Sequence, residues 1–413
     1  MSDKLVSRFI TFAKYETRSD EASTTVPSTS NQTAFAKEIL LPELEAIGLD
    51  DILYNPANGF VTATLPANTD EDLPTIGFIA HIDTADFEAA DVKPLFHENY
   101  DGEAIVLNKE NNIVLSPVDF PNLKNYIGQT LITTDGHTLL GADDKAGIAE
   151  ILTAVELIKN DPSIKHGAVK VAFGPDEEIG RGADLFDVEG FAADFAYTMD
   201  GGPVGELQYE SFNAAQAIVT IQGKSVHPGS AKDTMVNAIK LALDFDSRLP
   251  QDQVPEKTEN REGFYLLADI EGNVDSSKLT YIIRDHDREL FEDKKALMQK
   301  ITDDMNKTYD EDRIKLSLSD QYYNMGELLQ KDMRPVSLAE KAMKAIDIEP
   351  VIEAIRGGTD GSKLTFMGLP TPNIFAGGEN FHGRYEFVAV ESMVKATNVI
   401  VEIIRQSKHY NDL

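Results

Sequence analysis

The first half of the chain alternates short apolar runs with segments of helical periodicity. Two mainly apolar runs, 74–80 and 168–173, have the length and composition of buried strands. Between them, apolar residues from Ile148 to Ile158 recur at helical spacing on one face of the segment 144–160. This alternation predicts an α/β domain that has a mixed, largely parallel sheet with helices on both faces.

The pattern changes near residue 211, where a second kind of domain is indicated. From there to about 325 the order of segments is βαββαβ, which is typical of a compact ferredoxin-like unit. The predicted strands are 214–222, 263–271, 278–285 and 313–321, and the predicted helices are 234–248 and 289–309. Afterwards the α/β pattern returns, with helix 336–346, strands 350–355 and 371–375, and a long helix from 388. We therefore expect an α/β domain, residues 1–210 and 326–413, interrupted by an inserted domain at 211–325.

Acids and histidines gather at the points where the apolar segments end. Active sites of parallel sheets lie at the carboxyl ends of the strands, so we expect these residues to converge. Alone, each has an ordinary structural explanation, such as a core histidine, a helix cap or a solvated acid. Their joint placement favours one site. The residues are His81 and Asp83, Asp143 and Asp144, Glu177 and Glu178, Asp200, and His382.

Histidine and carboxylate donors without sulfur suit a pair of divalent metal ions. The chain has no cysteine, which excludes thiolate ligands and disulfides. Zinc is the first choice, with manganese or cobalt as substitutes. Such a dinuclear site can hold a bridging hydroxide nucleophile and polarise a carbonyl group. Asp143 is the expected bridging ligand, because its neighbour Asp144 is then left to cap the helix.

The remaining acids of the predicted site have roles beside the metals. In the His-x-Asp pair, Asp83 shares a strand face with His81 and is expected to accept the second ring N–H of that histidine. Glu177 and Glu178 are adjacent and point in different directions. One of them can bind metal while the other takes a proton from water as the general base.

Seven motifs, in order along the chain, resemble those of the peptidase T family. This family of tripeptide aminopeptidases belongs to the larger clan of aminoacylase, carboxypeptidase G and acetylornithine deacetylase. The resemblance covers essentially the whole chain. It implies a zinc-dependent hydrolase with an α/β catalytic domain and a lid, which releases the N-terminal residue from tripeptides. The motifs are HIDTAD, LLGADDKAGIAE, PDEEIGRGAD, TMDGG, GKSVHPGSAKD, RGGTDGS and NFHGRYEFV.

The resemblance also implies a role for each site residue. One zinc would be held by His81, Asp143 and Asp200, and the other by Asp143, Glu178 and His382. Glu177 would be the general base and Asp83 the partner of His81, while His227, Arg284 and Arg356 would contact the substrate. The long segment at roughly 88–134 resembles an insertion typical of peptidase T and weighs against the deacetylases and desuccinylases of the clan.

The composition narrows the range of partners. There are 70 acidic and 38 basic residues, and the formal net charge of −32 disfavours binding to nucleic acid or to anionic membranes. No apolar run approaches the roughly 18 residues that span a bilayer, and the N-terminal segment lacks the apolar core of a signal peptide. We therefore predict a cytoplasmic enzyme whose partners are short peptides; the oligomeric state stays open.

Three other interpretations of the sequence compete with this one. The same metal site could serve a dipeptidase or an N-acyl amino acid deacylase of the same clan. A binding protein without activity would keep the ligands and lose the base, whereas Glu177 is present. A zinc phosphoesterase is disfavoured by the negative charge and by the lack of a basic phosphate clamp.

Overall fold

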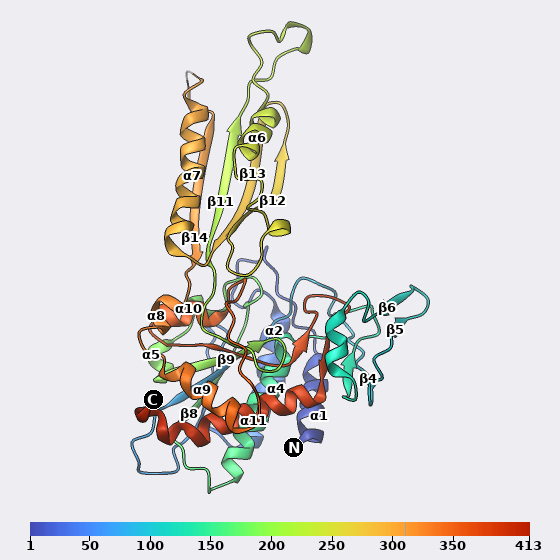
Figure 1. Ribbon diagram of the computed structural model, residues 1–413, viewed down its shortest axis with the longest axis vertical. Coiled ribbons are helices and arrows are strands. Elements are labelled where there is room, and N and C mark those ends of the chain that lie inside the picture. The colour runs from blue at the N-terminus through green and yellow to red at the C-terminus, as the bar shows by residue number, and fades with distance from the viewer. Residues whose placement is uncertain (310) are drawn as a thin grey trace. The chain divides into compact units, whose positions relative to one another are not determined.

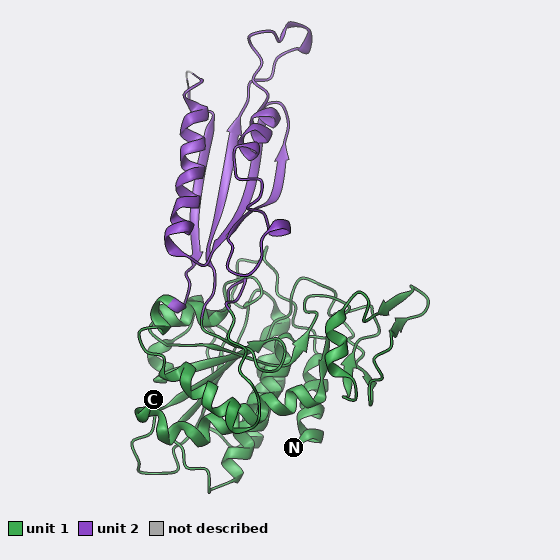
Figure 2. Ribbon diagram, viewed as in Figure 1, with its two compact units in different colours: residues 1–209, 327–353, 359–413 green, residues 210–326, 354–358 purple. Residues whose placement is uncertain are grey.

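The computed structural model describes residues 1–309 and 311–413, which form two compact units (Figure 1 and Figure 2). Unit 1 comprises residues 1–209, 327–353 and 359–413, and unit 2 comprises residues 210–326 and 354–358. The insertion thus begins and ends within one residue of the predicted borders. Residues 354–358 differ from the prediction, because they belong to the inserted unit: the Ile355 N–H donates to the carbonyl of Glu210 at 2.9 Å.

Unit 1 is built on a mixed sheet of seven strands in the order β1-β2-β8-β3-β9-β15-β10. The four strands β8, β3, β9 and β15 run parallel, whereas β1, β2 and β10 pair antiparallel at the two edges. The predicted largely parallel sheet is confirmed. The strands are β1 (Asp50–Tyr54), β2 (Val61–Leu65), β3 (Ile76–His81), β8 (Val169–Gly174), β9 (Phe195–Gly201), β10 (Leu207–Gln208) and β15 (Asn373–Phe375).

Helices cover both faces of this sheet, which explains why every residue of β3 is buried. Phe78 belongs to the larger core, with α1, α4, α9 and α11, whereas the adjacent Ile79 packs into a smaller core with α5 and α10. Successive side chains of a strand point to opposite faces, so both faces are apolar and covered. The helices are α1 (Ser2–Ala13), α2 (Ser30–Phe35), α3 (Leu41–Ile47), α4 (Ala142–Asn160), α5 (Val188–Phe191), α8 (Gly326–Leu329), α9 (Arg334–Ala345), α10 (Asp360–Phe366) and α11 (Val390–Gln406).

The segment predicted as an insertion, 88–134, forms a small layer of its own within unit 1. Its strands pair with a late part of the chain in a four-stranded sheet of order β16-β17-β7-β4, and β5 and β6 form a hairpin. Leu131 and Phe387 share a separate apolar core there. The strands are β4 (Leu95–His97), β5 (Ile105–Asn108), β6 (Ile113–Leu115), β7 (Leu131–Thr133), β16 (Gly378–Glu379) and β17 (Phe387–Ala389).

Unit 2 has the predicted βαββαβ order, with an antiparallel sheet β12-β13-β11-β14. Inward-facing residues alternate along β11, where Ala215, Ala217, Val219 and Ile221 pack into one core with α6 and α7. The first strand of the unit, β11, lies between the third strand, β13, and the fourth strand, β14, which is the ferredoxin-like arrangement. The elements are β11 (Asn213–Gln222), α6 (Ala238–Ser247), β12 (Phe264–Gly272), β13 (Ser276–Asp285), α7 (Arg288–Asn306) and β14 (Ile314–Tyr322).

The predicted strand 350–355 is wrong. Val351 forms a single bridge to Glu206, and its N–H donates to the carbonyl of Gly205 at 2.7 Å. Val351 and Ile352 are exposed, so the apolar run lies on the surface instead of in the sheet. From residue 354 the chain enters unit 2, which ends the pairing.

Within the described ranges we find no helix long and apolar enough to cross a membrane.

Candidate metal centre

The candidate ligands come from the ends of neighbouring parallel strands and from two loops. His81 is the last residue of β3, Asp200 lies near the end of β9, and Glu178 follows β8. Asp143 lies at the start of α4, and His382 lies in the loop between β16 and β17. Because β8, β3 and β9 are adjacent and parallel, their carboxyl ends bring these side chains to one edge of the sheet, as the sequence predicts.

Asp143 lies at the centre of the group. Its Oδ1 is 2.8 Å from Nε2 of His81, and its Oδ2 is 3.0 Å from Nε2 of His382. Nε2 of His81 also lies 3.4 Å from Oδ1 of Asp200, and Nε2 of His382 lies 3.1 Å from Oε2 of Glu178. Each histidine therefore faces one oxygen of Asp143 and one further acid.

Two groups of donor atoms are close enough to hold a cation. One contains His81, Asp143 and Glu178, and the other contains His81, Asp144 and Asp200; within each group the donor atoms lie within 4.8 Å of one another. Among the described residues, Oε1 of Glu178 and Oδ1 of Asp144 are buried and have no hydrogen-bond partner. A buried carboxylate oxygen without a partner is costly, so these atoms fit a site that binds divalent cations.

Asp144 does not cap the helix as predicted. Its side chain turns inward, where Oδ2 accepts the backbone N–H of His81 at 3.2 Å, and the N-cap position of α4 is Gly141, which has no side chain to cap the helix. Asp143 and Asp144 both have non-helical backbone angles, so the regular part of α4 begins after them. Asp144 therefore braces the end of β3, whereas Asp143 presents both oxygens to histidines.

Asp83 holds both the His81 ring and the loop of the two glutamates. The nearer acceptor for Nδ1 of His81 is the backbone carbonyl of Asp83, at 3.0 Å, and the carboxylate Oδ1 lies at 3.3 Å. A carbonyl can only accept, so Nδ1 carries the proton and Nε2 is left to bind a cation. The Asp83 carboxylate also accepts the N–H groups of Glu177 and Glu178, at 3.0 and 3.2 Å.

Burial and mutual repulsion shape the acidity of the site. Burial raises the pKa of Glu178 to about 7 and that of Asp200 to about 6. Burial, followed by the charge of Asp200, raises the pKa of Glu177 well above its ordinary value. Burial alone would raise the pKa of Asp143, but hydrogen bonds from His382 and His81 lower it instead. So many acids in one buried group favour the binding of cations.

Three further buried acids near the site are missing from the predicted set. Asp176 accepts the N–H of Ser28 at 2.8 Å, Asp360 accepts the N–H of Ala183 at 3.1 Å, and Glu386 accepts three backbone N–H groups. All three lie inside motifs that the sequence singles out. Residue type does not separate an acid that holds backbone amides from a solvated acid, so the sequence carries no signal for this role.

The three predicted substrate contacts belong to unit 2, whereas the candidate ligands belong to unit 1. His227 is exposed, and its Nδ1 accepts the N–H of Gly229 at 3.1 Å. Arg284 is half-buried; Nη1 donates to the carbonyl of Ile283 at 2.9 Å, and the guanidinium lies 5.5 Å from the ring centre of Tyr322.

Arg356 is engaged by the loop 258–262 of the same unit. Its Nη1 donates to the carbonyls of Asn260 and Glu262 at 2.7 and 3.1 Å, and its Nη2 donates to Oγ1 of Thr258 at 3.1 Å. The guanidinium also lies 5.3 Å from the ring centre of Phe212. These contacts give Arg356 a structural role in unit 2, whereas the sequence assigned it to the catalytic domain.

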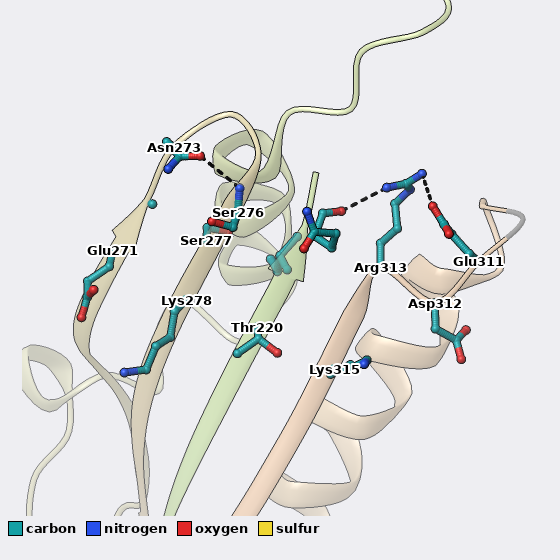
Figure 3. Close-up of a pocket in the computed structure, with 13 residues that line it drawn as sticks. Thr220, Glu271, Asn273, Ser276, Ser277, Lys278, Glu311, Asp312, Arg313 and Lys315 are labelled. Atoms are coloured by element: carbon teal, nitrogen blue, oxygen red, sulfur yellow. Dashed lines mark hydrogen bonds and ion pairs between the residues drawn. The ribbon is translucent and has the colours of Figure 1, made fainter. Parts of the chain in front are cut away.

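A separate pocket of about 640 Å³ lies at one end of the unit 2 sheet (Figure 3). Its lining mixes the cations Lys278, Arg313 and Lys315 with acids, and Arg313 pairs with Glu311 at 2.7 Å. The predicted site residues are not part of its lining. This pocket is therefore distinct from the candidate metal centre.

Comparison with known proteins identifies close relatives over nearly the full length. The chain is 61% identical to peptidase T of Enterococcus faecalis over 404 residues, covering 98% of both chains. It is 60% identical to peptidase T of Fusobacterium nucleatum over 401 residues, covering 97% of both. Residues 209–313 match a family model described as a peptidase dimerisation domain, which lies within unit 2 except for its first residue.

Solved structures share the fold at lower identity. Aminopeptidase PepT from Bacillus cereus has a TM-score of 0.77 at 23% identity and covers 99% of both chains. A tripeptidase from Staphylococcus aureus has a TM-score of 0.78 at 22% identity and covers 98% of both. A dinuclear metal-binding peptidase of the M20 family from Bacillus subtilis has a TM-score of 0.66 at 15% identity, covering 98% of this chain and 97% of that one. The mixed α/β fold with an inserted domain is thus shared with peptidases.

Proposed function

The chain belongs to the peptidase T family, and from this membership we propose that it is a zinc-dependent aminopeptidase that releases the N-terminal residue of tripeptides. The proposal rests on one observation above all. The two oxygens of the Asp143 carboxylate each face Nε2 of a different histidine, His81 at 2.8 Å and His382 at 3.0 Å. A carboxylate placed in this way can join two cations in one site.

The remaining donors divide between the two cations. His81 and Asp200 would complete the ligands of one zinc, and Glu178 and His382 those of the other, with Asp143 shared. Asp143 is favoured over Asp144 as the shared ligand because Asp144 already accepts the backbone N–H of His81. When bound, the two ions would act as Lewis acids toward the peptide carbonyl and would make a water molecule more acidic.

Glu177 is the proposed general base. It follows β8 at the same edge of the sheet, and the Asp83 carboxylate holds its backbone N–H at 3.0 Å. Burial and the charge of Asp200 raise the pKa of Glu177, which makes it a stronger base than an exposed glutamate. Its carboxylate takes the proton of the attacking water and passes it to the amine that leaves when the peptide bond breaks.

Substrate choice separates this function from its main alternative, a dipeptidase or N-acyl amino acid deacylase of the same clan. We expect Ala-Ala-Ala to be cleaved at its first peptide bond with a higher kcat/KM than Ala-Ala, and N-acetyl-alanine to be left intact. Product analysis by mass spectrometry at matched substrate concentrations would measure all three rates. Faster release of acetate from N-acetyl-alanine would instead support the deacylase.

Recognition of the substrate carboxylate is proposed for Arg284, with His227 as a further contact. Arg284 is half-buried, so a carboxylate that reaches its guanidinium would make a charge-assisted bond that is partly shielded from water. Such a bond contributes about 1.5–3 kcal/mol, or roughly ten- to a hundred-fold in affinity. We therefore expect Arg284→Ala to raise KM for tripeptides by this factor, and to raise KM for their C-terminal amides much less.

Arg356→Ala is the matched control for this prediction. The sequence proposes the same contact for Arg356, but its guanidinium is held by the carbonyls of Asn260 and Glu262. Its removal should lower stability and change KM equally for the free acid and the amide. Equal changes of KM in the Arg284 variant would contradict the assignment of Arg284 to the carboxylate.

A further inference from the structure

Glu386 binds the backbone of the loop that carries Asp143. Its Oε2 accepts the N–H of Leu140 at 2.7 Å and the N–H of Gly141 at 2.8 Å. Its Oε1 accepts the N–H of Asp143 at 3.1 Å. Glu386 is buried, with 1% of its surface exposed, so these bonds are shielded from water. One side chain thus uses both oxygens to fix three amide groups of a single short loop.

The backbone N–H of Asp143 takes its hydrogen bond from a distant segment. Asp143 lies at the start of α4 with φ −84° and ψ 103°, which is not a helical conformation. The regular helix begins only after Asp144, so the N–H of Asp143 precedes it and must find its partner in another segment. Glu386 provides that partner for Asp143 itself, and therefore restrains the direction in which the Asp143 side chain leaves the backbone.

The position of Glu386 is fixed by the strand that follows it. It directly precedes β17, where Val388 pairs with Ile132 and Ala389 pairs with Leu131 of β7. The same loop, four residues earlier, carries His382, whose Nε2 lies 3.0 Å from Oδ2 of Asp143. One segment therefore provides a histidine that faces the Asp143 carboxylate and an acid that holds the Asp143 backbone.

We propose that Glu386 is a positioning residue, which keeps the Asp143 carboxylate oriented so that it can be shared by two zinc ions. This inference rests on the proposed function, since it concerns how tightly the two ions are bound. Groups that orient metal ligands typically change metal affinity by about 10- to 100-fold when they are replaced. Glu386 would act through Asp143 and would not touch the ions or the substrate.

The test is the zinc affinity of the full-length Glu386→Gln variant, measured by competition with a chromophoric chelator. Glutamine has one acceptor oxygen, and its NH₂ group would face a backbone N–H that needs an acceptor. We expect binding about 10- to 100-fold weaker than in the unchanged protein, and activity that returns when zinc is added in excess. Zinc affinity within twofold of the unchanged protein would overturn the proposal.

Glu391→Gln is the matched control. Glu391 also accepts a backbone N–H with both oxygens, that of Thr130 at 3.2 and 3.0 Å, but it holds no candidate ligand. It should lose stability in urea unfolding while its zinc affinity stays unchanged. Equal losses of zinc affinity in the two variants would mean that Glu386 acts only through general stability, which contradicts the proposal.

Glu386→Asp provides a second variant in case the glutamine variant does not fold. It keeps the charge, but the side chain is one methylene shorter and cannot reach all three amides. We expect zinc affinity below that of the unchanged protein. If Glu386 acted only through its negative charge, the zinc affinity of this variant would stay unchanged. Failure of the unchanged protein to bind two zinc ions would refute the proposed function itself, which distinguishes that outcome from failure of the inference.

Discussion

Glu177→Gln should lower kcat by roughly 10²–10⁴-fold, or more if the water also loses its position. The change removes the base, while the shape of the side chain stays nearly the same. Glu177 is not among the proposed ligands, and the Asp83 carboxylate would still hold the backbone N–H of residue 177. Zinc content should therefore stay at the level of the unchanged protein, as measured by elemental analysis beside the steady-state rates.

Glu178→Gln is the paired variant for this measurement. Oε2 of Glu178 lies 3.1 Å from Nε2 of His382, which places it among the proposed ligands. We expect this variant to lose zinc first and activity as a consequence. If Glu177→Gln kept more than a tenth of the normal kcat, the base would have to be another group, and Glu178 would be the first to examine.

Removal of zinc should abolish activity, and two zinc ions per chain should restore it. Five side chains converge at one edge of the sheet, and Asp143 faces both histidines, so a single ion would leave some donors without a role. Activity should therefore follow the second equivalent of zinc when chelated protein is titrated with the metal.

Replacement of Asp143 by asparagine offers a check of the shared ligand. Asparagine has one oxygen where aspartate has two, so it cannot serve both ions as a carboxylate does. We expect this variant to bind one ion weakly or none, with loss of activity. Full activity of the unchanged protein with one ion or none, measured by elemental analysis, would rule out the dinuclear site.

The sequence predicts the framework of this protein well because strong periodic signals determine it. The apolar stripe from Ile148 to Ile158 is buried in α4, and the alternation along β11 faces the core of unit 2. The candidate acids and histidines of unit 1 also lie close together as expected, because each stands where a buried segment ends, and their roles stay a prediction. The prediction of a strand at 350–355 is wrong, since Val351 and Ile352 lie exposed beside a two-residue edge strand.

Such sequence patterns do not predict the hydrogen bonds that orient the site. Glu386 binds amides that precede it by 243 to 246 positions, and Asp83 binds those of Glu177 and Glu178, 94 and 95 positions later. These bonds depend on how distant segments pack and on backbone groups that every residue possesses. No period or motif marks them, so they become visible only in the folded chain.

The strand order of unit 1 also determines when this protein can fold during its synthesis. β15 lies between β9 and β10, yet it begins 165 residues after the end of β10 and runs from Asn373 to Phe375. The strands and helices of unit 2 are contiguous and are complete at Tyr322. Domains fold as units as they leave the ribosome, so the inserted unit can fold while the first 209 residues still wait for their missing inner strand. His382 emerges later still, so the candidate metal centre can be completed only after that residue has been made.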